Sequence, residues 1–251
     1  MVAVSSRVVL VAVLAAGCQR SLADTDGAFY SATMTTRVHC AVNLDSSADT
    51  SFDSIDSGLD RAHDRGEIVE LYAHHPGVTV PIATIEHVLA GAQSRQLAFV
   101  TYADLAAGTA QFPGLALSFD DTSVDAWIAI LPLLAQYDAR VTFFVSRWKF
   151  LSDAEHAELQ QLAAAGHAIE PHTVLHLRAP DYVEQYGLDD YMANEFQPSR
   201  DVLDGEGFTT TAFAYPFGSR TDELDRALLE RVGVVRSVAF TFEGDGGPCP
   251  R

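Results

Sequence analysis

The stretch GLALSFDDTSVDAWIAILPLLAQYDARVTFFVS, residues 114–146, decides the fold class of this chain. Residues 114–119 are mostly apolar and residues 140–146 are rich in β-branched and aromatic residues, as is typical of strands. Residues 124–137 have the amphipathic pattern of a helix, in which we expect Pro132 to cause a kink or to lie early. A strand, a helix and a second strand in this order predict neighbouring parallel strands joined by a helix.

The same alternation continues on both sides of this stretch, from about residue 36 to residue 240. Further strands are predicted at 37–44, 67–74, 97–102, 167–170, 210–215 and 234–240, and helices at 54–66, 84–96, 152–166, 181–207 and 222–233. Such regular alternation predicts parallel strands with helices outside, as a closed barrel or an open sheet. In both architectures, chemistry gathers in the loops that follow the strands.

Composition and the N-terminal residues indicate the class of partner and the cellular location of the protein. Its formal net charge is −18 and is spread along the sequence, which argues against a nucleic-acid partner. Residues 1–18 read as a secretory signal, and LAAGC is similar to a lipoprotein signal that ends at a lipidated Cys18. We therefore expect export, either to the cell envelope with a lipid anchor as the only membrane contact or as a secreted protein. Residues 19–35 are expected to be flexible, and residues 36–251 to form a single domain.

Three loops that follow predicted strands carry reactive side chains. The first has Asp120 and Asp121, the second has His172 and His176, and the third reads AYPFG. Each has an ordinary interpretation, as a helix cap, a hydrogen-bonded histidine pair or a tight turn. Together, one carboxylate and two imidazoles form a set that binds a divalent metal with open positions, and the second carboxylate remains available as a base.

These motifs resemble the polysaccharide deacetylases, the NodB-homology group of carbohydrate esterase family 4. That family has a Thr-Phe-Asp-Asp strand end, then a His-Ser/Thr-x-x-x-His motif or a variant, then an Arg-x-Pro-Tyr turn. Here the motifs read SFDD (118–121), HTVLH (172–176) and AYPFG (214–218). The resemblance covers roughly residues 96–240 and implies a distorted parallel (β/α)7-type barrel with the NodB-like fold.

The resemblance also implies a ligand set and a reaction. Asp121, His172 and His176 would bind a divalent metal, with zinc expected and other divalent ions as alternatives. Asp120 would be the general base in a hydrolysis by metal-activated water. The implied substrate is an N-acetylated polysaccharide, either chitin-like, poly-N-acetylglucosamine or peptidoglycan, and acetyl esters are an alternative.

The third motif would supply the oxyanion side of the site. Tyr215, Pro216 and Phe217 would contact the substrate, and the backbone N–H of Phe217 would help to hold the developing oxyanion. Ala214 falls where the family often has an arginine that orients the base. This departure leaves the activity of the site open.

A second departure concerns the general acid. The family ends its site with a late Leu-x-His strand, but no histidine follows His176. One explanation is truncation or an inactive relative. We prefer a circular permutation, because residues 54–105 resemble the C-terminal portion of the family. His74, in Tyr-Ala-His, would then be the general acid, with His75 as its neighbour.

A permuted barrel would place strand 37–44 beside strand 234–240. Cys40 and Cys249 could then form a disulfide between the new chain ends, and two unpaired thiols are the alternative.

Two alternatives to the deacetylase also remain, namely a weakly active or inactive glycan-binding protein and an amidase acting on small molecules. The oligomeric state is not predicted.

Overall fold

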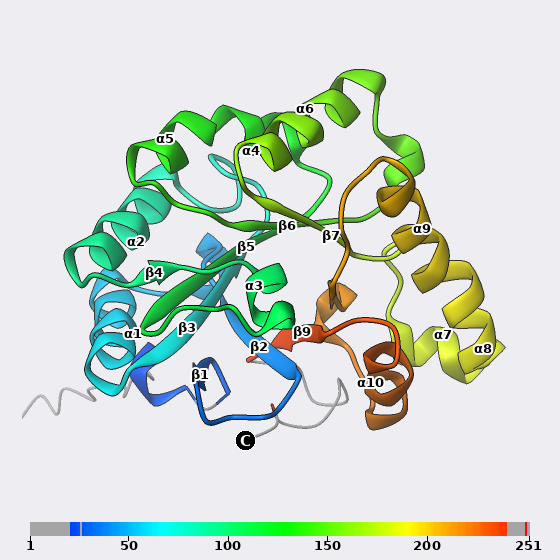
Figure 1. Ribbon diagram of the computed structural model, residues 1–251, viewed down its shortest axis with the longest axis horizontal. Coiled ribbons are helices and arrows are strands. Elements are labelled where there is room, and N and C mark those ends of the chain that lie inside the picture. Colours follow the sequence, from blue (N-terminus) through cyan, green and yellow to red (C-terminus); the bar gives the residue numbers. More distant parts are fainter. Residues whose placement is uncertain (1–20, 26, 240–248, 250–251) are drawn as a thin grey trace, which may run out of the picture.

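Seven parallel strands curve into a nearly closed barrel, as the sequence predicts (Figure 1). The computed structural model describes residues 21–25, 27–239 and 249. The expected signal segment with Cys18 lies outside these residues. Around the sheet, the strands are β7 (Ala168–Pro171), β6 (Thr142–Val145), β5 (Gly114–Asp121), β3 (Glu67–Ala73), β2 (Val38–Asn43), β9 (Val234–Val238) and β8 (Ala212–Ala214).

A buried carboxylate joins the two ends of this strand order. Glu170 in β7 is fully buried and accepts hydrogen bonds from the backbone N–H groups of Thr211 and Ala212, at 2.9 and 3.0 Å. It also accepts from the hydroxyl of Thr211 at 3.1 Å. β7 and β8 stand at the two ends of the strand order and are not paired as strands. The Glu170 side chain supplies the hydrogen-bond acceptors that a neighbouring strand would otherwise provide to β8.

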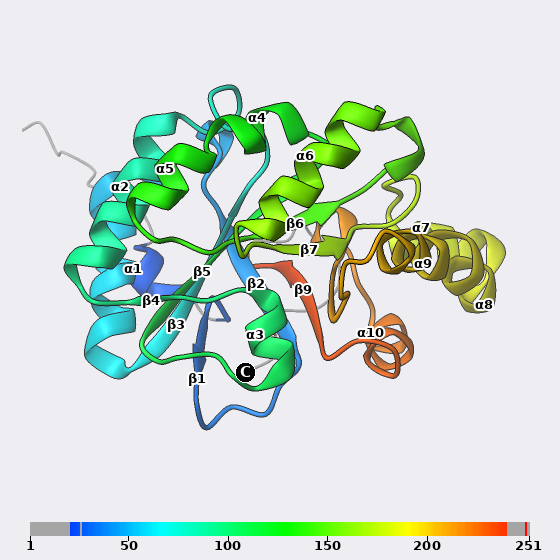
Figure 2. The same ribbon diagram turned by 45° about the horizontal axis from the view of Figure 1, so that its top comes forward.

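Helices surround the barrel. They are α1 (Phe52–Arg65), α2 (Ile82–Ser94), α3 (Tyr102–Ala107), α4 (Val124–Ala129), α5 (Leu131–Gln136), α6 (Asp153–Ala164), α7 (Ala179–Tyr186), α8 (Leu188–Tyr191), α9 (Gln197–Gly205) and α10 (Asp222–Leu229). The break between α4 and α5 precedes Pro132, in agreement with the prediction. Helices α7 to α10 gather on one side of the barrel in both views (Figures 1 and 2).

Short elements complete the chain. They are η1 (Leu22–Asp24), β1 (Phe29–Ser31), η2 (Ser46–Ala48), β4 (Ala98–Phe99), η3 (Trp148–Phe150), η5 (Pro216–Gly218) and the π-helical turn η4 (Met192–Phe196). In the part of the chain that the structure describes, no helix is long and apolar enough to cross a membrane.

The N-terminal segment that we expected to be flexible is instead part of the fold. β1 pairs antiparallel with β3, with Phe29 opposite Val69. Leu22 is 2% exposed, and the guanidinium of Arg61 lies 3.7 Å from the ring centre of Phe29. The polar composition of residues 19–35 suggested flexibility, but these two apolar side chains are sufficient to anchor the segment on α1 and β3.

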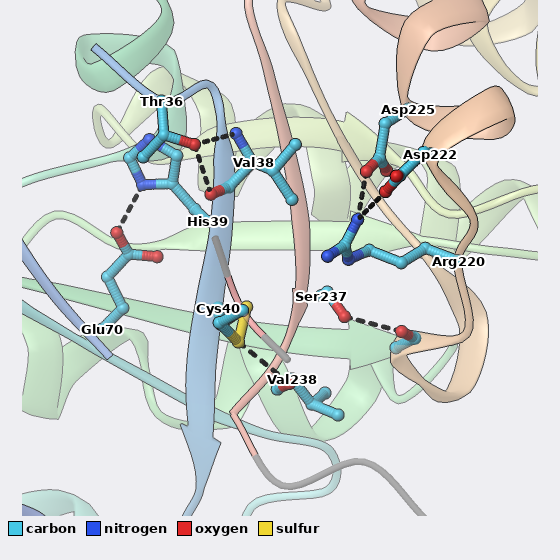
Figure 3. The surroundings of a disulfide bond; sticks show 12 residues. Thr36, Val38, His39, Cys40, Glu70, Arg220, Asp222, Asp225, Ser237 and Val238 are labelled. Carbon is cyan, nitrogen blue, oxygen red and sulfur yellow. Dashed lines mark hydrogen bonds and ion pairs between the residues drawn. A yellow bond between two sulfur atoms is a disulfide. The ribbon is translucent and has the colours of Figure 1, made fainter. Parts of the chain in front are cut away.

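β2 lies between β3 and β9, which confirms that strand 37–44 is next to strand 234–240. Val38 is opposite Val235, and Cys40 is opposite Ser237. Cys40 forms a disulfide with Cys249, with the two Cα atoms 6.1 Å apart. Figure 3 shows this bond beside the end of β9, where Val238 lies. The disulfide therefore fixes a residue near the C-terminus to a strand near the N-terminus.

Candidate active site

The two aspartates of the first motif are the last residues of β5. Asp120 is 3% exposed, whereas the side chain of Asp121 is 35% exposed. Asp121 has a left-handed backbone with φ of 85°, so the strand ends there and the two carboxylates point differently. One carboxylate is thus enclosed in the barrel while the other faces the loop that follows β7.

His172 and His176 meet Asp121 at the end of β7. The Oδ1 atom of Asp121 lies 3.0 Å from Nε2 of His176 and 3.7 Å from Nε2 of His172. One donor atom from each of the three side chains lies within 4.8 Å of the others. Burial alone would raise the pKa of Asp121, but the contact with His176 and the charges of both histidines hold this pKa well below its ordinary value.

A hydrogen bond fixes which nitrogen of His172 faces Asp121. Nδ1 of His172 donates to the backbone carbonyl of Ala214 at 2.8 Å, so Nε2 is left with a lone pair. Burial lowers the pKa of His172 to about 4, and the ring is therefore neutral at neutral pH. A neutral imidazole held in one orientation is the form that ligates a metal.

Glu195 in η4 supports the loop that carries both histidines. Its buried carboxylate accepts from the backbone N–H of Leu175 at 2.9 Å, and its carbonyl accepts from the N–H of Val174 at 3.2 Å. The loop has left-handed backbone at Thr173 and His176, with φ of 70° and 60°. These contacts stabilise a conformation that non-glycine residues adopt rarely.

Arg236 in β9 forms an ion pair with Asp120 inside the barrel. Nη2 of Arg236 donates to Oδ2 of Asp120, and both residues are buried. The guanidinium lies 4.8 Å from the ring centre of Tyr72 and 5.1 Å from that of Phe144. Oδ1 of Asp120 has no hydrogen-bond partner among the residues that the structure describes. One carboxylate oxygen is thus held by the cation, and the other remains available for a proton.

His74 follows β3 and contacts a buried aspartate. Its Nδ1 bonds with Oδ2 of Asp45, whose Oδ1 accepts from the hydroxyl of Thr79 at 2.7 Å. Burial alone would lower the pKa of His74, but the hydrogen bond with Asp45 and the charges of Asp120 and Asp121 outweigh it and raise this pKa to about 9. His74 is therefore protonated at neutral pH.

The AYPFG turn lines the same cavity as His74. The hydroxyl of Tyr215 donates to Asp225 at 2.8 Å, which orients the buried ring, and Pro216 is also buried. Phe217 has φ of 59°, is 53% exposed, and has its ring centre 4.7 Å from that of His176. The turn thus places an aromatic side chain beside the histidine pair.

The reactive side chains of the three motifs and His74 line one cavity of about 320 Å³, whereas Asp45, Pro216 and Glu195 lie outside its lining. The cavity is lined by Tyr72, His74, Asp120, Asp121, His172, His176, Arg178, Tyr215, Phe217, Gly218, Arg236 and Val238. His74, and not His75, belongs to this set. The structure therefore brings together the residues of all three motifs with His74 and adds Arg236, Tyr72 and Arg178.

Comparison with known proteins identifies the class. The family model described as polysaccharide deacetylase matches residues 107–236, which are 130 of the 251 residues. The chain therefore belongs to the polysaccharide deacetylase family and is an enzyme of that family. No curated protein matches the chain.

Two solved structures are similar in fold. The structure of Streptococcus pyogenes deacetylase PplD in complex with acetate has a TM-score of 0.52 and 22% sequence identity, over 65% of this chain and 78% of that chain. The chitin deacetylase from the fungal pathogen Colletotrichum lindemuthianum has a TM-score of 0.39 and 23% identity, over 49% of this chain and 54% of that chain. At these identities, the likeness to PplD shows the fold.

Sequence reasoning missed three residues around the site, namely Arg236, Asp45 and Glu195. An arginine inside the strand VVRSV is a usable signal, because a cation in a buried strand needs a buried anion. An aspartate just after strand 37–44 is a weaker signal for Asp45. Glu195 has none, because its segment reads as an ordinary amphipathic helix.

Proposed function

We propose that this enzyme is a metal-dependent deacetylase that hydrolyses acetyl groups of an N-acetylated glycan. One observation carries the proposal: the paired aspartates, both loop histidines and His74 come from three separate strand ends and line a single cavity. Each motif alone has an ordinary structural interpretation. Their convergence supports a catalytic one.

The donor set fits a divalent metal. Asp121, His172 and His176 offer one oxygen and two nitrogens, a set that suits zinc and leaves further positions open. His172 is already neutral and fixed by the carbonyl of Ala214, as a metal ligand requires. When bound, the metal would supply a Lewis acid and lower the pKa of a coordinated water.

The remaining residues have separable roles. Oδ1 of Asp120 would accept a proton from the attacking water, while Arg236 holds Oδ2. The N–H of Phe217 would donate to the oxyanion that forms from the acetyl carbonyl. His74, protonated because of Asp45, would give its proton to the leaving amine.

Arg236 also bears on the alternative of an inactive binding protein. Ala214 removes the arginine that the family turn often carries, yet a buried guanidinium from β9 reaches the same aspartate. An ion pair built from a different strand favours a working base over a decayed site.

The strand order supports a circular permutation. β3, which precedes His74, lies directly beside β5, with Ala73 opposite Phe119. The family model begins at residue 107 and so does not include β3. We infer that β2 and β3 correspond to the end of the family barrel and lie first in this chain. We also retain export, with lipidation of Cys18, as part of the proposal.

The test is acetate release from acetylated chito-oligosaccharides by the zinc-loaded wild type, Asp120→Ala and His74→Ala, with metal content measured in each. We expect both variants to keep the metal and to lose release by at least about 100-fold, since a general acid or base contributes about 10²–10⁴. Loss in Asp120→Ala alone would remove His74 as the acid. No release by the metal-loaded wild type would overturn the glycan deacetylase, and release from small acetamides alone would favour the amidase.

A further inference from the structure

Two loops beside the cavity have a charge opposite to that of the whole chain. The loop after β6, residues 146–152, contains Arg147 and Lys149, and the loop after β7, residues 172–180, contains Arg178. Neither loop contains an aspartate or glutamate, although the chain has 34 acidic residues against 16 Lys and Arg and a net charge of −18. We call Arg147, Lys149 and Arg178 the basic rim.

The basic rim is connected to the catalytic cavity. Arg178 lines the cavity together with Asp121 and His176. The backbone N–H of Arg147 donates to the carbonyl of Thr173 at 3.3 Å, and its Nε lies 3.4 Å from the carbonyl of Leu175. The β6 loop is therefore tied to the loop that carries both histidines. Arg178 also pairs with Asp181 at 3.1 Å, but the side chain of Asp181 is 68% exposed, so water screens this pair.

Exposed apolar side chains lie in these two loops and in the AYPFG turn. Phe150 is 73% exposed, Leu175 45%, Leu177 39% and Phe217 53%. Large apolar residues with such exposure mark binding surfaces when they gather near a cavity. The apolar face of a sugar ring packs against aromatic and aliphatic side chains, whereas guanidinium groups bind carboxylate or phosphate with paired hydrogen bonds.

We propose that the basic rim binds acidic substituents of the glycan, so that the preferred substrate is an anionic glycan carrying carboxylate or phosphate groups. The inference rests on the proposed function and narrows its substrate class. The proposal depends on charge complementarity between the basic rim and the glycan. A polymer with negative groups would be repelled by much of this acidic protein and attracted at the basic rim, which would guide it to the cavity.

Three tetrasaccharide probes of equal length and acetylation test the proposal. One is neutral acetylated chitotetraose, one carries a carboxylate on every second sugar, and one carries a phosphate monoester on every second sugar. The test variant is Lys149→Gln combined with Arg178→Gln. The matched control is Arg65→Gln together with Arg226→Gln, which makes the same charge change on α1 and α10 and outside the cavity lining.

Two readouts are needed. Binding is measured by calorimetry in an Asp120→Asn background, which prevents turnover, and kcat/KM for acetate release is measured with Asp120 intact. We expect the wild type to prefer at least one anionic probe over chitotetraose by about tenfold at low salt. The rim variant should reduce this preference to about twofold or less, mainly through binding, and the control pair should preserve it. Comparing the two anionic probes identifies the preferred acid group.

Failure of this inference differs from failure of the proposed function. Equal binding of all three probes by the wild type, or an equal loss of preference in the control pair, would overturn the basic rim. If no probe released acetate, the deacetylase proposal would fail, and the binding measurements would still decide whether the basic rim selects acidic glycans.

Discussion

At the scale of single residues, the least expected contact is the buried ion pair between Arg236 and Asp120. Nε and Nη1 of Arg236 have no hydrogen-bond partner within the described part of the chain. The rings of Tyr72 and Phe144 instead cover the guanidinium and attract it through their π-systems. The cation is thus fixed by packing as well as by charge, which suits a group that positions a catalytic base.

Replacing Arg236 by methionine should leave Asp120 buried without its cation. We expect the free energy of unfolding to fall by about 3–5 kcal/mol, because an uncompensated buried charge is costly. Adding Asp120→Asn should recover part of this loss. Urea unfolding of the two single variants and the double variant measures the coupling. Additive losses would show that the two side chains do not depend on each other.

Asp45→Asn tests the electrostatic environment of His74. The wild-type pKa of about 9 keeps the imidazole protonated at neutral pH and removes the proton as pH rises through that value. Without the Asp45 carboxylate, the pKa should fall towards 6.5, its ordinary value. The alkaline limb of the kcat/KM profile for acetate release should therefore move to lower pH. A limb that stays in place would mean that another group titrates there.

At the scale of elements, the site depends on loops that adopt strained backbone conformations. The histidine loop is held by a carboxylate and a carbonyl from a π-helical turn, a feature that often occurs at functional sites. Segment 181–207, predicted to be helical, forms α7, α8, η4 and α9, and its residue Glu195 provides this support. The turn η4 therefore helps to hold the loop that carries His172 and His176 in the conformation that metal binding needs.

Glu195→Gln should weaken metal binding without removing a ligand. The amide cannot accept as strongly from the N–H of Leu175, so the neighbouring His176 should be held less firmly, whereas His172 keeps its bond to Ala214. We expect zinc affinity to fall by about 10-fold or more, as for other groups that orient ligands. Calorimetric titration of metal-free protein measures it. Glu184→Gln on exposed α7 is the matched control, and equal affinities in both variants would contradict this role.

At the scale of the whole molecule, local patterns predicted most of the architecture. The alternation of strands and helices and the paired motifs at strand ends depend on short stretches, so parallel strands with outer helices and the grouping of Asp120, Asp121, His172 and His176 could be expected. The alternation left a closed barrel or an open sheet, and the family resemblance favoured the barrel. Arg236 and Glu195 could not be paired with their partners, because those contacts join residues far apart in the chain. These contacts form only when folding brings distant segments of the chain together.

The disulfide between Cys40 and Cys249 constrains the whole chain. It closes a loop across 209 positions, and the chain-entropy model gives about 5 kcal/mol for so long a loop. Cys249→Ser should therefore lower Tm markedly under oxidising conditions. Reductant should lower the Tm of the wild type to that of the variant and should leave the variant unchanged. Equal Tm values for the oxidised wild type and the variant would contradict this stabilisation.

The position of β2 determines when the molecule can finish folding. Val42 pairs with Leu71 on one side, but Val38 pairs with Val235 on the other. While the chain is being synthesised, the edge of β2 that faces β9 lacks its partner until β9, nearly 200 positions later, has emerged from the ribosome. An open strand edge is prone to mispairing, and pairings between distant segments form slowly. The barrel should therefore close only after β9 has been synthesised.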